Sequence, residues 1–202
     1  DNPKHILSYV PPEHNVCIVK NRLTYHYAFI YARENIELNK SVAIMNLDIF
    51  LEESETWENI DEEFFADNGL DKVLCLTRHE YDNPESKRNW GGACFDAWIF
   101  KNPIREMDDC KFAVGNAPFC DNAINRRFYD NGYKVFNWAL KYRIWHLDIC
   151  RKTKSKSMIQ NKTTDHTAKE AASRGRLDVS ATEFNWNREM KTLKMPKYRL
   201  KI

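Results

Sequence analysis

The sequence predicts an α/β fold, a single domain in which helices flank a central, mixed and mostly parallel sheet. Short apolar runs alternate with stretches of helical periodicity along residues 1–150, as strands and helices do in α/β domains. Several of these runs end in polar or charged residues, and ligands bind beyond the carboxyl ends of strands in such sheets. With 202 residues, 43% of them apolar, the chain can form one substantial core.

The first part of the chain is expected to contain three strands and a helix. Residues 5–10 and 15–20 are typical of short strands, the first of them ended by two prolines. Apolar residues recur at helical spacing within RLTYHYAFIYAREN, residues 22–35, which predicts a helix. That helix leads into an apolar strand over residues 41–51.

The middle of the chain is expected to form one helix and two strands. Trp57, Ile60 and Phe64 follow helical spacing, with Ser54 as a possible N-cap and Gly69 as the end of the helix. Strands are predicted within KVLCLTRHE, which ends at residue 80, and within FDAWIFKNP, which begins at residue 95. The segment between them is rich in Pro, Asn and Gly and is typical of a loop.

The remainder of the first 150 residues predicts a helix and two more strands. The helix is expected to start at Asp121 or Asn122 and to end at the Asn-Gly pair of residues 131–132. YKVFNWAL and YRIWHLD, which follow it, are typical of short strands.

The charge distribution divides the chain at about residue 150. Residues 1–150 carry 17 Lys and Arg against 24 Asp and Glu, a net charge of −7, whereas residues 151–202 carry 14 against 5, a net charge of +9. We therefore expect a core over 1–150 and a basic segment over 151–202 that packs on or near it, flexible at 151–165 and helical within 167–190. Nucleic acid, an acidic lipid surface, a phosphate-bearing ligand and the acidic core are all possible partners for such a segment.

Cysteine usage and hydropathy favour a soluble, cytoplasmic protein. The six cysteines include no C-x-x-C pair, and several lie within apolar runs, so reduced core residues are expected and a structural zinc site is not. No apolar run approaches the roughly 20 residues that cross a bilayer, and the start has no signal-peptide pattern. Because the first residue is not Met, further domains of a longer parent chain are possible.

The apolar run VAIMNLDIFLE contains two polar residues that need an explanation, because a buried polar group without partners costs free energy. Asn46 and Asp48 are two residues apart, so on one strand they would share a face. A carboxylate at a strand end suits Mg²⁺ or Mn²⁺, which bind oxygen ligands and often bridge to substrate phosphates. The alternative is that Asp48 only caps the turn after the strand.

Other candidate residues stand near predicted strand ends, and each has a structural alternative. Asp96 abuts an apolar strand and needs a partner or a pocket, whereas Asp121 precedes a helix and could be its N-cap. His146 could be a ligand or a hydrogen-bonded core residue. Arg78 could hold a phosphate or pair with Glu80 or another carboxylate, and the same two readings apply to Arg22.

The common nucleotide-binding and hydrolase motifs are absent from the chain. The sequence has no G-x-x-x-x-G-K-[ST], no G-x-G-x-x-G and no G-x-S-x-G. P-loop kinases, Rossmann oxidoreductases and α/β-hydrolases therefore lose their main support.

Six motifs, taken in order, resemble the GT-A-fold (Rossmann-like) glycosyltransferases over about residues 22–148. They are RLTYHYAFIYAREN, VAIMNLDIFLE, VLCLTRHE, DAWIF, FCDNAI with NGYKVFN, and IWHLD. The chain is most similar to members of this family that help build the glycan on the major capsid protein of chloroviruses. The resemblance implies sugar transfer from a UDP-sugar to a glycan or glycoprotein acceptor, with Mn²⁺ or Mg²⁺ as the metal, in the host cytoplasm if the protein is viral.

The resemblance also implies roles for individual residues. Asn46-Leu47-Asp48 stands where these enzymes carry a D-x-D motif, so Asp48 would bind the metal, although Asn46 departs from the pattern. His146 matches a late His that also reaches the metal or the diphosphate. Arg22 and Arg78 match positions that contact the nucleotide or the diphosphate.

The two remaining acidic candidates match positions that face the sugar and the acceptor. A carboxylate that takes the acceptor's proton would be Asp121 first and Asp96 second. Whether the transfer inverts or retains configuration stays open.

Two other functions remain compatible with the sequence. Asp48, Asp96, Asp121 and His146 could instead serve a metal-dependent phosphohydrolase or nuclease. A non-enzymatic module that binds through its basic tail is the other alternative, although nucleic acid is not the expected partner.

Overall fold

The computed structural model describes most of the first 147 residues and parts of the remainder. The described ranges are 16–67, 69–81, 94–115, 120–147, 170, 173–179 and 199–201. The strand predicted at 5–10, most of the loop predicted before residue 94 and the basic stretch 151–165 lie outside them.

The main sheet has four strands, in the order β1 (Ser41–Met45), β5 (Ala97–Lys101), β3 (Lys72–Leu76) and β6 (Lys134–Phe136). β5 lies between β1 and β3 and runs antiparallel to both, and β3 pairs parallel to β6. The prediction of a mixed sheet in an α/β fold is confirmed, but the prediction that it is mostly parallel is wrong. The apolar pattern of a buried strand does not reveal its direction, which depends on the order of the strands in the sheet.

A second sheet of three strands has the order β2 (Ile49–Leu51), β7 (Ile144–His146) and β4 (His79–Glu80). β7 is antiparallel to β2 and parallel to β4. The predictions of one strand over 41–51 and one over 72–80 are therefore wrong in extent. Each run is interrupted, and it contributes its first part to the main sheet and its second part to the second sheet. The breaks fall at polar residues, 46–48 and 77–78.

Helices α2 (Tyr25–Asn35) and α5 (Cys120–Asp130) confirm two of the sequence predictions. The Thr24 hydroxyl begins α2 by accepting a hydrogen bond from the backbone N–H of Tyr27, at 3.1 Å. The helix predicted after Ser54 is divided into α3 (Glu55–Glu58) and α4 (Ile60–Glu63).

The end predicted for that divided helix is also different. Gly69 does not end it, but begins the short 3-10 helix η1 (Gly69–Asp71).

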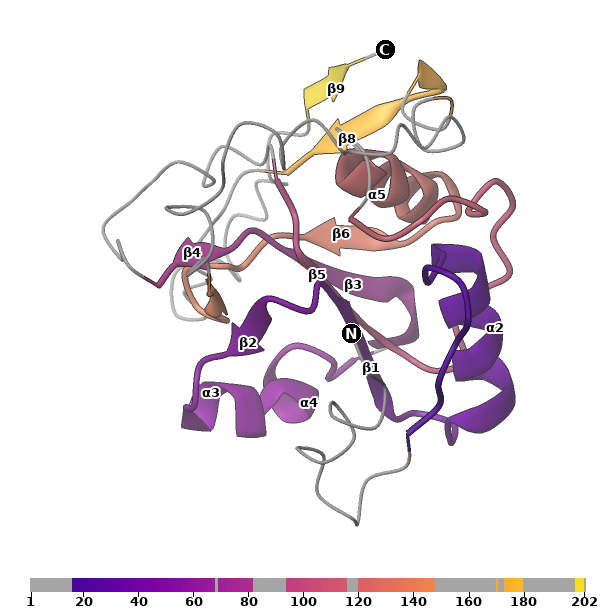
Figure 1. The fold of residues 1–202 in the computed structure, drawn as a ribbon. Coiled ribbons are helices and arrows are strands. Elements are labelled where there is room, and N and C mark those ends of the chain that lie inside the picture. The colour runs from indigo at the N-terminus through magenta and orange to yellow at the C-terminus, as the bar shows by residue number, and fades with distance from the viewer. Residues whose placement is uncertain are drawn as a thin grey trace.

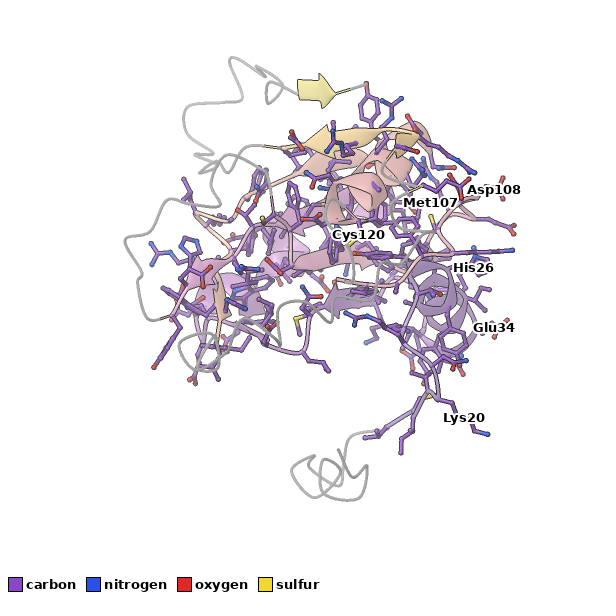
Figure 2. The ribbon with its side chains drawn as sticks, turned by 45° about the horizontal axis from the view of Figure 1, so that its top comes forward. Lys20, His26, Glu34, Met107, Asp108 and Cys120 are labelled. Carbon is purple, nitrogen blue, oxygen red and sulfur yellow. The ribbon has the colours of Figure 1, made fainter. Side chains whose placement is uncertain are left out.

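Figure 1 shows α5 above the main sheet and α3 and α4 below it, and apolar side chains fill the space on both faces. Alternate strand residues face opposite sides, so Cys75 and Trp98 join one core cluster with Phe29 of α2 and Phe128 of α5. The neighbouring residues Leu74, Leu76, Ala97 and Ile99 join a second cluster that contains the apolar residues around α4 and β7. Cys120, at the start of α5, lies in the interior (Figure 2) and is 2% exposed.

Near the carboxyl end, β8 (Arg176–Asp178) pairs antiparallel with β9 (Arg199–Lys201) and lies against α5. Leu177 and Val179 are fully buried in the first core cluster. The helix predicted within 167–190 is therefore wrong at β8, where apolar and charged residues alternate with the period of a strand.

The strand predicted at 15–20 is also wrong, because residues 16–20 form no strand. The predicted division at residue 150 stays a prediction.

The described cysteines are all free thiols. Cys75, Cys110 and Cys120 are buried, as predicted for reduced core residues, whereas Cys17 is exposed. Burial raises the pKa of the Cys110 thiol to about 12.

In the part of the chain that the structure describes, no helix has the length and apolar character needed to cross a membrane.

Candidate functional site

Several predicted site residues meet at one edge of the main sheet because of the register of its strands. Met45 and Leu76, the last residues of β1 and β3, are both paired with Ala97, the first residue of β5. Asn46 and Asp96 therefore lie side by side, and the backbone N–H of Asn46 donates to the Asp96 carbonyl at 3.1 Å. The carboxyl ends of β1 and β3 and the start of β5 form one edge.

Asn46 and Asp48 belong to a turn between β1 and β2, so the expectation that they share one strand face is wrong. The strand ends at Met45, and the two side chains have different partners, because Asn46 Nδ2 donates to Asp96 Oδ1 whereas Asp48 Oδ2 faces His146 Nε2. The backbone N–H of Ile49 donates to the Asn46 carbonyl at 3.2 Å, while the Leu147 N–H donates to the Asp48 carbonyl at 2.9 Å. The turn thus directs Asn46 toward the main sheet and Asp48 toward the second sheet.

The Asp96 carboxylate is buried, 4% exposed, and is held by two donors. Asn46 Nδ2 donates to Asp96 Oδ1 at 2.7 Å. Arg78 Nη1 lies 3.0 Å from both oxygens of the same carboxylate. A buried carboxylate needs such partners, and here the partners come from the ends of β1 and β3.

Glu80 lies on the other side of Arg78 and joins it to His146. Arg78 Nε donates to Glu80 Oε1 at 3.1 Å, and His146 Nδ1 lies 2.9 Å from Glu80 Oε2. β4 and β7 are paired with Glu80 beside His146, which explains the contact. Burial raises the pKa of Glu80, but the hydrogen bonds and charges of His146 and Arg78 outweigh burial and leave that pKa below its ordinary value.

His146 bridges Glu80 and Asp48. Its Nε2 lies 3.0 Å from Asp48 Oδ2, and its side chain is 2% exposed, whereas the Asp48 side chain is 55% exposed. Two carboxylates thus face the two ring nitrogens. Both nitrogens can donate only when the imidazole is positively charged.

These contacts form a continuous network that the turn after β1 closes. We call it the polar ring, and it consists of Asn46, Asp96, Arg78, Glu80, His146 and Asp48. It lies across the junction of the two sheets, at the points where the chain passes from one sheet to the other. Of its charged members, Asp48 alone has a half-exposed side chain.

The structure places Arg22 outside the polar ring. Its Nε and Nη2 donate to the Val114 carbonyl at 3.1 and 3.0 Å. The next residue, Gly115, has a φ of 62°, and a Cβ atom there would lie 2.4 Å from Asn46 Oδ1. Arg22 also lines a cavity of about 360 Å³, together with Lys20 and Tyr27, and the Lys20 side chain stands at the periphery (Figure 2).

Asp121 is in the first turn of α5 and is also outside the hydrogen bonds of the polar ring. Its Oδ2 accepts a hydrogen bond at 2.8 Å from the backbone N–H of Phe95, the residue before Asp96. Burial raises the pKa of Asp121 to about 6, and the nearby Asp96 charge adds to this effect. The pKa of Asp121 therefore lies near the pH at which a general base works.

The chain was compared with protein-family models, curated proteins and solved structures. None of the three comparisons found a match. The geometry of the site must therefore carry the functional argument.

The site offers a small donor set for a divalent cation. Among the described residues, no group of three or more His, Cys, Asp and Glu side chains is placed to hold a metal ion. Asp48 and His146 still present a carboxylate oxygen beside an imidazole nitrogen. A cation that binds substrate phosphates needs only one or two protein ligands, and the imidazole suits Mn²⁺ better than Mg²⁺.

The sequence indicates Glu80 only as a possible partner for Arg78, whereas in the structure Glu80 joins Arg78 to His146 within the polar ring. The signal available in the sequence was its position. Glu80 ends the segment Thr77-Arg78-His79-Glu80, which follows a buried apolar run, and a buried acid there needs cationic partners. That signal does not indicate His146, which is 66 residues away in the chain.

Proposed function

We propose that this protein is a metal-dependent glycosyltransferase that takes a sugar from a UDP-sugar. The observation that carries the proposal is the convergence of five of the seven residues singled out in the sequence into one polar ring. These five are Asn46, Asp48, Arg78, Asp96 and His146. Motifs spread over about a hundred positions thus contribute to one hydrogen-bonded network, which is what the proposal of a single site expects.

Asp48 and His146 are the residues that would hold Mn²⁺. The bound metal would neutralise negative charge on the departing diphosphate. Asp48 is suited to this role because its side chain is half-exposed, whereas the ring members behind it are buried. The loss of a second acid at Asn46 is consistent with a site that gains further ligands from the phosphates of the donor.

Asp121 is the proposed base. Its raised pKa, about 6, lets it take a proton near neutral pH. Asp96 is buried and paired with Arg78, so its negative charge is already compensated. We assign Asp96 to fixing Arg78 and Asn46, and Asp121 to the acceptor hydroxyl.

The arrangement gives less support to a phosphohydrolase or nuclease. A pair of metal ions would need several carboxylates to face one point. Asp96 faces Arg78 and Asn46, and one oxygen of Asp121 binds the Phe95 backbone, so these carboxylates are directed to other partners.

Ligand-dependent thermal unfolding tests the proposal. The full chain is measured with UDP, GDP, ADP and CMP, each with and without Mn²⁺. We expect UDP with Mn²⁺ to stabilise the protein most, because a ligand at 100 times its Kd adds about 2.7 kcal/mol. If no nucleoside diphosphate raises the Tm in the presence of Mn²⁺, the proposal is wrong.

Asp48→Asn separates the metal from the nucleotide in this measurement. The variant removes the carboxylate charge, so we expect the Mn²⁺-dependent part of the UDP shift to disappear while the Tm without ligand changes little. Asp108→Asn is the matched control, because Asp108 is exposed, lies at the periphery of the molecule (Figure 2) and makes none of the hydrogen bonds of the polar ring. Equal shifts in wild type and Asp48→Asn would assign Asp48 to the turn alone.

A further inference from the structure

We propose that Glu80 is the positioning residue of the site, which fixes the ring of His146 so that Nε2 faces Asp48. This inference deepens the proposed function and rests on it for the identity of the bound metal. Glu80 would act from a largely buried position, since its side chain is 11% exposed.

The two oxygens of Glu80 have separate tasks. Oε2 faces His146 Nδ1 at 2.9 Å, and Oε1 accepts from Arg78 Nε at 3.1 Å. Arg78 is in turn held by Asp96, so the carboxylate of Glu80 cannot rotate away without breaking an ion pair. The acid that orients the imidazole is therefore itself held in place.

The backbone alone does not orient the imidazole. Pairing with β2 and β4 fixes the backbone of His146, but the torsion that rotates a His ring has two broad, nearly equivalent minima. The two minima exchange the ring edges, so that Nε2 can face Asp48 in only one of them. An acceptor at Nδ1 selects one orientation and keeps a proton on Nδ1, so that Nε2 is the nitrogen that can bind a metal ion when the ion enters between it and Asp48.

The first test is spectroscopic and needs no ligand. Ring ¹⁵N–¹H correlation spectra of the full chain would be recorded for wild type and Glu80→Gln, and the His146 signals would be assigned from their absence in His146→Gln. We expect a single set of His146 ring signals with a hydrogen-bonded Nδ1–H in wild type, where Nε2 also faces Asp48, and more than one set in Glu80→Gln. An unchanged pattern in Glu80→Gln would overturn the proposal.

The second test measures Mn²⁺ binding directly, from the electron paramagnetic resonance signal of free Mn²⁺ in the presence of UDP. We expect Glu80→Gln to bind Mn²⁺ about 10- to 100-fold more weakly, the usual effect of losing an outer partner of a metal ligand. Its affinity for UDP without metal should be unchanged. Mn²⁺ affinity within twofold of wild type would overturn the proposal.

A control and a second variant keep these tests decisive. Glu63→Gln removes another paired carboxylate, which contacts Lys141 and Tyr142 outside the polar ring, and it should leave both measurements unchanged. If Glu80→Gln does not fold, Glu80→Asp keeps the charge but is too short to reach both partners, and the same weakening is expected. If wild type binds no Mn²⁺, the proposed function fails, and the ring spectrum alone decides the role of Glu80.

Discussion

Asp96 and Asp121 show how two nearby acids can have different environments. Asp96 has a guanidinium and an amide as partners, whereas Asp121 has backbone N–H groups and a neighbouring negative charge. Burial without a cation favours the neutral form of a carboxyl group, which is why the pKa of Asp121 is raised. Asp121 is therefore expected to titrate at a higher pH than an ordinary aspartate.

The raised pKa of Asp121 predicts a pH-dependent loss of stability. The folded protein holds this proton up to about pH 6, whereas the unfolded chain releases it near pH 4. Ionisation therefore costs folding free energy, on the order of 3 kcal/mol, as the pH rises from about 4 to 6. Urea unfolding of wild type and Asp121→Asn across this range checks the effect, because the variant lacks the titrating group.

One result would contradict the predicted effect of Asp121 on stability. If wild type and Asp121→Asn lose stability in parallel between pH 4 and 6, another group titrates there. Asp108→Asn, a change at a peripheral acid, should follow the wild-type curve throughout.

Gly115 predicts a second effect at the scale of one residue. An alanine there would adopt a strained positive φ and would place its Cβ 2.4 Å from Asn46 Oδ1. We expect Gly115→Ala to displace Asn46, to lower the Tm and to reduce the Mn²⁺-dependent UDP shift.

Gly132→Ala is the matched control for that change. Gly132 also has a positive φ, 80°, but its added Cβ would meet only the end of the flexible Arg105 side chain. It should lower stability by roughly 1 kcal/mol from backbone strain and leave the ligand shift intact. If the two variants behave alike, the Asn46 contact does not support the site.

At the scale of elements, the sequence predicted the helices better than the strands. α2 and α5 follow from helical spacing and their ends. The runs 41–51 and 72–80 are each continuous in apolar character, so periodicity gave no reason to divide them. The polar residues inside both runs mark the divisions. The second part of each run becomes a separate strand because it pairs with β7, which comes about 65 to 100 residues later in the chain.

β8 supplies a prediction at this scale. Leu177 is fully buried against α5, although it belongs to the segment expected to be a basic tail. We expect Leu177→Ala to destabilise the protein by about 2–5 kcal/mol, the usual cost of truncating a core leucine. Urea unfolding measures this, with Leu70→Ala as the control because Leu70 is 41% exposed. A change below about 0.5 kcal/mol would mean that β8 contributes little to the core.

At the scale of the whole molecule, the sequence pointed to residues that the fold brings together, but it did not predict their arrangement. Residue chemistry and position near strand ends selected five members of the polar ring. The order of their contacts could not be predicted, because it depends on the pairing of two sheets. The choice between phosphate contact and ion pair for Arg78 likewise depends on Glu80 and Asp96, which only the fold brings to it.

The closed form of the polar ring has a consequence for how the chain can vary in length. β2 and β4 are both registered on His146, through Ile49 and Glu80. One residue added between β1 and β2, or between β3 and β4, would exchange the two faces of the strand that follows. The side chains of that strand that now face the junction of the sheets would then point away from it. The distances along the chain from β1 to β2 and from β3 to β4 are thus as much a part of the site as the side chains themselves. Substitutions can be compensated by a new partner, but a change of spacing cannot.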